Sequence, residues 1–158
     1  MCVDRQAMVQ SMRKKAEGYY ERGELFCSEA VVHVVNEALG WPFPREITML
    51  ASAFPVGLGK AGCLCGAVSG GAMALGMAYG RKHGDSMSDK LFPLAASLHD
   101  HIKAVYGSTC CRVLIKGFLL PWRRKAHCVK ISGEVAAFVL GQLLQDEAIA
   151  ARLAELKS

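Results

Sequence analysis

The chain has 158 residues, of which 52% are hydrophobic and 21% are charged. This composition excludes an intrinsically disordered chain, and the length fits one domain over residues 1–158 whose core needs no disulfide cross-links. The net charge of +5 is modest and acidic residues are interspersed with basic ones, which argues against nucleic-acid binding. We find neither a secretory signal pattern nor an uncharged apolar run of ~18 residues, and therefore expect a cytoplasmic protein without a membrane span.

Helical patterns follow one another along the chain. Residues 4–21 are rich in helix formers, and residues 27–39 place their valines on one face. We expect a short helix over 44–54, a glycine-rich loop over 57–62, and further helices over 65–79, 88–105, 110–116, 128–144 and 146–156. No pair of segments shows the two-residue alternation of strands. The sequence therefore predicts an all-α fold, a compact single-domain bundle of about six to seven helices.

Cysteine is unusually frequent, with seven residues at positions 2, 27, 63, 65, 110, 111 and 128. Thiols in the cytoplasm are kept reduced, so a structural disulfide framework is not expected. Metal binding or redox chemistry is the better hypothesis.

Four of these cysteines begin an apolar stripe in the first turn of an expected helix: Cys27, Cys65, Cys111 and Cys128. Inward-facing thiols at helix N-termini can converge on one site. Unpaired N–H groups there stabilise thiolates and lower their pKa, and they also favour an anionic thiolate–metal cluster. Small residues let a cluster approach the backbone, so we expect four of them to line it: Gly62, Gly66, Ala67 and Gly70.

Simpler interpretations apply to the same residues. Free cysteine is often a core filler, and a stripe of glycine and alanine often serves close helix packing. The stretch GLGKAG lacks the Gly-Lys-Ser/Thr ending of a phosphate-binding loop. No Cys-x-x-Cys pair occurs, which excludes a zinc ribbon, a thioredoxin motif and c-type haem attachment.

The cysteine segments also resemble a known family. Residues 26–30 read FCSEA, 65–70 read CGAVSG and 111–114 read CRVL, and Cys128 precedes a hydrophobic helix. Together they resemble the redox-active proteins named for the pattern C_GCAxxG_C_C. The resemblance implies four signature cysteines, at positions 27, 65, 111 and 128. The chain is also similar to the iron–sulfur part of split-Soret cytochromes, which implies a cluster-binding helical homodimer without the haem motifs. Cys63 and Cys110 adjoin two signature positions and are alternative ligands.

Three functions remain open. The first is electron transfer or redox sensing by a [2Fe–2S] or [4Fe–4S] cluster on the four cysteines, with an acidic redox partner protein docking on the basic residues. The second is an enzyme, a thiol–disulfide or peroxide/metalloid reductase without a cofactor, in which Cys65 attacks and Cys63 resolves. The third is a zinc-binding or interaction protein. Whether the protein is an enzyme is left undecided by the sequence.

Overall fold

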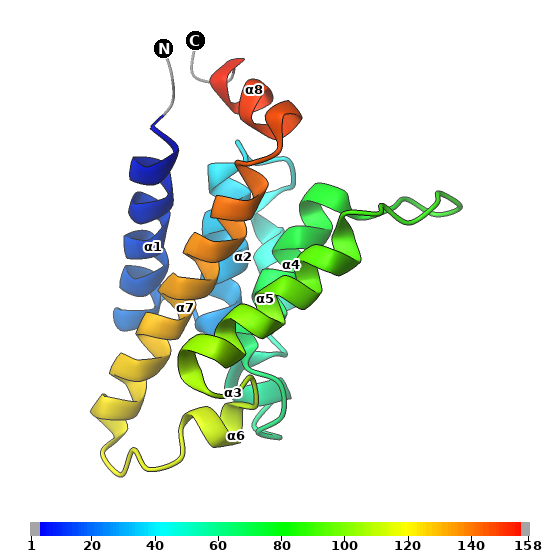
Figure 1. Cartoon of the computed structure of the whole chain (residues 1–158). Coiled ribbons are helices and arrows are strands. Elements are labelled where there is room, and N and C mark those ends of the chain that lie inside the picture. Colours follow the sequence, from blue (N-terminus) through cyan, green and yellow to red (C-terminus); the bar gives the residue numbers. More distant parts are fainter. Residues whose placement is uncertain (1–3, 156–158) are drawn as a thin grey trace.

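The computed structural model describes residues 4–155, which fold into helices and connecting turns (Figure 1). The elements are α1 (Arg5–Glu21), α2 (Cys27–Ala38), the 3-10 helix η1 (Arg45–Ala51), α3 (Pro55–Leu58), α4 (Gly66–Tyr79), α5 (Leu91–Tyr106), α6 (Cys111–Leu114), α7 (Pro121–Leu143) and α8 (Glu147–Glu155). Within the described range no strand forms, and the only β-type pairing is an isolated bridge between Leu64 and Cys110. The predicted all-α fold is confirmed.

The core lies between α1, α2, α4, α5 and α7. Helix α2 packs against α1, α4 and α7, and five of its apolar residues are fully buried: Ala30, Val31, Val32, Val34 and Val35. Helices α3 and α6 and the connection from α6 to α7 gather at the lower end of the bundle in Figure 1, and α8 lies at the upper end. Burial of the apolar faces of the long helices is what holds these elements together.

Small residues bring α4 unusually close to α2. A Cβ atom added at Gly70 would lie 2.5 Å from the Ser28 carbonyl oxygen, which leaves space for hydrogen only. The buried Ser28 hydroxyl in turn donates to the Ala51 carbonyl oxygen at 2.8 Å, which ties α2 to η1. Close helix packing therefore explains part of the glycine and alanine stripe.

Three boundaries differ from the expected ones. Helix α7 begins at Pro121 instead of residue 128, so Cys128 lies two turns inside the helix and not in its first turn. Proline suits the first helical position, but residues 121–126 are exposed, so no apolar stripe marks this part of the helix in the sequence. The segment expected to form a helix over 44–54 forms the 3-10 helix η1, and α5 starts at Leu91.

Among residues 4–155, no single helix combines the length and hydropathy of a membrane span. Helices α7 and α8 satisfy that test only when they are taken together across a bend of 97°.

Candidate functional site

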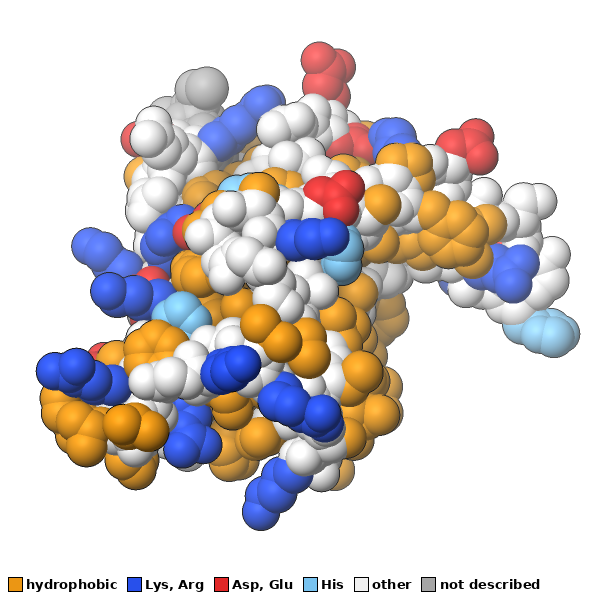
Figure 2. All heavy atoms as spheres, turned by 60° about the horizontal axis from the view of Figure 1, so that its bottom comes forward, with side chains coloured by type: hydrophobic (Ala, Val, Ile, Leu, Met, Phe, Trp, Pro, Cys, Tyr) orange, Lys and Arg blue, Asp and Glu red, His pale blue; other side chains and the backbone are white. Residues whose placement is uncertain are grey.

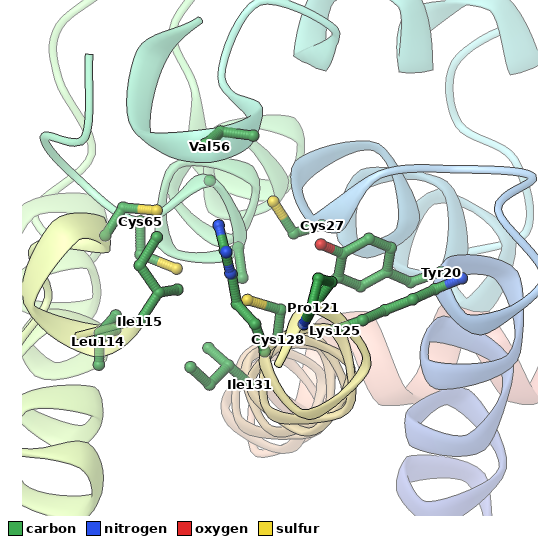
Figure 3. Close-up of a pocket in the computed structure, with 14 residues that line it drawn as sticks. Tyr20, Cys27, Val56, Cys65, Leu114, Ile115, Pro121, Lys125, Cys128 and Ile131 are labelled. Carbon is green, nitrogen blue, oxygen red and sulfur yellow. The ribbon is translucent and has the colours of Figure 1, made fainter. Parts of the chain in front are cut away.

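The four cysteines that begin the apolar stripes line one pocket of about 280 Å³ at the lower end of the bundle. Cys27 begins α2, Cys65 directly precedes α4, Cys111 begins α6, and Cys128 lies within α7. Figure 3 shows the sulfurs of Cys27, Cys65 and Cys128 directed toward a common space. The fold thus brings together thiols that lie up to a hundred residues apart in the sequence.

The pocket is walled mainly by apolar groups. Three polar side chains join the thiols around it: Tyr20 from α1, and Arg124 and Lys125 from the exposed first turns of α7. The remaining lining residues are Val56, Gly66, Ala67, Leu114, Ile115, Pro121 and Ile131. An apolar wall with a few polar groups is typical of a cofactor or small-ligand site.

A left-handed turn over residues 56–60 borders the pocket, which Val56 lines. Residues 56–60 all have positive φ, including Val56 at 57°, a conformation that β-branched residues rarely adopt. The Val56 N–H faces the Cys27 sulfur, and a Cβ atom at Gly57 would lie 2.8 Å from the Cβ of Cys111. Unfavourable backbone geometry is therefore retained where the chain touches two of the four cysteines, as is common at functional sites.

Backbone hydrogen bonds fix the two cysteine-rich segments against each other. The Cys65 N–H donates to the Thr109 carbonyl at 2.8 Å, and the Cys111 N–H donates to the Cys63 carbonyl at 2.7 Å. These two bonds flank the bridge between Leu64 and Cys110. They set the relative position of Cys65 and Cys111 independently of any bound group.

Helix-start N–H groups face two of the sulfurs. The N–H groups of Val68 and Ala67 lie against Cys65, and that of Ser28 lies against Cys27, so each favours a thiolate.

Burial nevertheless outweighs these contacts. It raises the pKa of Cys27 to about 12 and that of Cys128 to about 11, and it also raises the pKa of Cys65 and Cys111. For Cys27, Cys111 and Cys128, neighbouring thiols raise the pKa further, because each would repel a second negative charge. The predicted lowering of the thiol pKa values is wrong, and the free thiols are protonated at neutral pH.

Tyr20 and Arg124 are pocket residues that the sequence analysis missed. The Tyr20 hydroxyl hydrogen bonds to the Cys128 sulfur and the Arg124 charge acts on the same sulfur, and both lower the pKa of Cys128 against the larger effect of burial. Spacing could have revealed them. Tyr20 continues the buried series Met12 and Ala16 at four-residue intervals, and Arg124 lies one turn before Cys128.

The other predicted residues are divided between the pocket and its surroundings. Gly66 and Ala67 line the pocket, whereas Gly62 and Gly70 do not. A Cβ atom at Gly66 would lie 2.6 Å from the Cys27 sulfur, so this glycine leaves room for the thiol.

The adjoining cysteines lie outside the pocket lining. Cys63 is exposed, and the half-buried Cys110 donates its S–H to the Gly62 carbonyl at 3.3 Å. Cys2 lies outside the described residues.

The thiols are not arranged around a single ion. Within residues 4–155, no group of three or more His, Cys, Asp or Glu side chains is disposed to hold a metal ion. A tetrahedral zinc site needs all of its sulfurs about 2.3 Å from one metal. The free side chains therefore do not form a ready-made site for one ion.

Comparison with known proteins identifies the family. The model described as "Putative redox-active protein (C_GCAxxG_C_C)" matches residues 25–141, which include all four pocket cysteines. The chain belongs to this family. No curated protein and no solved structure matches it.

Proposed function

We propose that this protein of the C_GCAxxG_C_C family binds an iron–sulfur cluster through Cys27, Cys65, Cys111 and Cys128 and acts in electron transfer or redox sensing. The observation that carries the proposal is the convergence of these four thiols, from four separate elements, on one largely apolar pocket. Four cysteines are the ligand set of both [2Fe–2S] and [4Fe–4S] clusters, and a bound cluster supplies one-electron redox chemistry.

The surroundings of the thiols support the same proposal. A thiolate-bound cluster is anionic, and the N–H groups around Cys27 and Cys65 and the Arg124 charge all favour negative charge on sulfur. Because the free thiols are protonated, loading the site releases protons, and its affinity therefore rises with pH.

The thiol–disulfide alternative receives less support. It requires a thiolate nucleophile at Cys65, but burial raises the pKa of this thiol, and its expected resolving partner Cys63 is exposed. Zinc stays an alternative, because four thiolates are also the ligand set of a structural zinc site.

The test is anaerobic reconstitution of the purified protein with iron and sulfide, followed by iron and sulfide analysis and a visible spectrum. Alanine is placed singly at each of the four pocket cysteines. The chain offers matched controls in Cys63→Ala and Cys110→Ala, which remove thiols that adjoin Cys65 and Cys111 but lie outside the pocket.

We expect a brown wild-type protein with stoichiometric iron and sulfide. Each pocket variant should lose the colour, and both control variants should keep the colour, the iron and the sulfide. A colourless wild-type protein, or loss of iron in the controls but not in the pocket variants, contradicts the proposal. A metal-free protein with a reversible dithiol titration that depends on Cys63 indicates the reductase instead.

A further inference from the structure

The connection from α6 to α7 and the first turn of α7 expose large apolar side chains. Leu119 is 93% exposed and Trp122 is 62% exposed, and Leu120 between them is also exposed. This connection lies at the lower end of the bundle, beside the pocket that Pro121 and Arg124 help to line (Figure 1). Apolar groups of this size are costly to leave in water and commonly mark an interaction site.

The segments on the other side of the pocket add further exposed apolar residues. These are Val56 and Leu58 in α3, Leu64 before α4, and Val113 in α6. With Leu119, Leu120 and Trp122 they form what we call the apolar rim. Figure 2, in which this end of the molecule comes forward, shows hydrophobic side chains interspersed with Lys and Arg over its lower part.

The charge around the apolar rim is positive. Segments 54–66 and 108–128 contain no Asp or Glu but six exposed basic residues: Lys60, Arg112, Lys116, Arg123, Arg124 and Lys125. The rest of the chain holds thirteen of the 19 basic residues and all 14 acidic ones, so its net charge is −1. The interspersion of acidic and basic residues therefore does not extend to these two segments, whose net charge of +6 exceeds the +5 of the whole chain.

These six cations have no anionic partner among residues 4–155, since none of them takes part in an ion pair. Acidic side chains beside Cys27 are engaged elsewhere. Glu24 pairs with Arg22, and Glu29 accepts hydrogen bonds from the Phe26 N–H and the Ser52 hydroxyl.

We propose that this end of the protein binds the surface of an anionic lipid bilayer. Leu119, Leu120 and Trp122 enter the boundary between headgroups and acyl chains, where tryptophan is favoured, and the six cations contact the anionic headgroups. The proposal concerns a peripheral contact, needs no membrane-spanning helix, and does not depend on a bound cluster.

Two other occupants fit the observations less well. A second copy joined through the same face would bring six cations against six, which is repulsive. An acidic protein matches the charge, but protein interfaces bury their main apolar anchors in fitted pockets. Here Leu119, in the connection, and Trp122, in the first turn of α7, are both exposed at one end of the bundle, which is the arrangement of a membrane-inserting tip.

The test uses vesicles of phosphatidylcholine with and without phosphatidylglycerol. The chain has two tryptophans, so Trp41→Phe leaves Trp122 as the single fluorescent reporter. We expect co-sedimentation with the anionic vesicles only, a blue shift of Trp122 emission, and quenching by brominated acyl chains. Leu119→Asp and the double change R123E/K125E should each weaken binding by roughly tenfold or more.

Matched controls are Met49→Asp, which alters a 72% exposed side chain in η1, and Lys82→Glu, in the connection between α4 and α5. Circular dichroism verifies that each variant is folded. Failure to bind anionic vesicles at low salt overturns the proposal, as do equal losses in the controls. Salt-sensitive binding that Leu119→Asp leaves unchanged, without quenching of Trp122, also overturns it and indicates an acidic protein partner. Cluster loading is not needed for any of these measurements, so their outcome is separate from that of the proposed function.

Discussion

Replacing Gly66 by alanine tests whether the first residue of α4 is small because the Cys27 thiol needs its space. The φ angle of Gly66 lies outside the left-handed region, so alanine meets no backbone strain there. Its methyl carbon would, however, lie 2.6 Å from the Cys27 sulfur and 3.0 Å from the Phe54 carbonyl oxygen. The contact with the sulfur is far shorter than the van der Waals distance, so the sulfur must move, and the contact with the carbonyl oxygen is tight by a few tenths of an ångström.

Forcing one extra methyl group into a packed site typically costs about 1–3 kcal/mol. Alanine gains little helix propensity at the first helical position, so we expect a net loss of about 2 kcal/mol in the free energy of unfolding. For a chain of this size, such a loss lowers Tm by about 4–8 °C. Because the displaced atom is a pocket sulfur, reconstituted iron per chain should fall as well.

The assay is urea unfolding of the metal-free protein, together with iron analysis after reconstitution. Gly76→Ala is the matched control, because it lies in the same helix and nothing approaches its added Cβ within 4 Å. It should stabilise the protein by about 0.5–1 kcal/mol. If Gly66→Ala is as stable as the wild type and loads the same amount of iron, the steric reasoning is refuted.

Three further predictions follow from the same region. The metal-free protein should lose stability as pH rises above 9. Burial raises the pKa of Cys27 to about 12 and that of Cys128 to about 11, whereas the unfolded thiols ionise near 9. Urea unfolding between pH 8 and 11 measures the free energy of unfolding, and a value that does not change with pH contradicts the prediction. Ser28→Ala should destabilise the protein by about 1–3 kcal/mol, because it leaves the buried Ala51 carbonyl without its hydrogen-bond donor. A change within experimental error in the same urea-unfolding assay would show that this hydrogen bond is dispensable. In the reconstituted protein, Tyr20→Phe should retain iron but lower the reduction potential, because it removes the hydrogen bond to the Cys128 sulfur. Voltammetry measures the potential, and an unchanged value would exclude that bond.

Local patterns predicted the parts of the fold that depend on helix periodicity. The stripe from Cys27 through Val31 to Ala38 gave the correct helix, and its inward face is the buried face. Residues 121–126 escaped prediction because they form exposed helical turns beyond the bundle, where no burial imposes a periodic pattern. The left-handed turn at residues 56–60 was expected only as a loop, since glycine spacing permits positive φ but does not dictate it at Val56.

The pKa values of the thiols required the tertiary structure. Helix starts favour thiolates locally, and that contribution is present at Cys65, but desolvation depends on how much protein surrounds the sulfur. Tyr20 acts on Cys128 only because α1 and α7 pack together.

The sequence by itself determined the helical class, the identity of the four pocket cysteines and the family, because each depends only on residue types and their local spacing. Only the tertiary structure decided that these thiols meet in one pocket, that Cys63 and Cys110 lie outside it, and that the positive charge gathers around its rim. The physical reason is that convergence depends on the packing of helices far apart in the chain, and no local pattern encodes the distance between them.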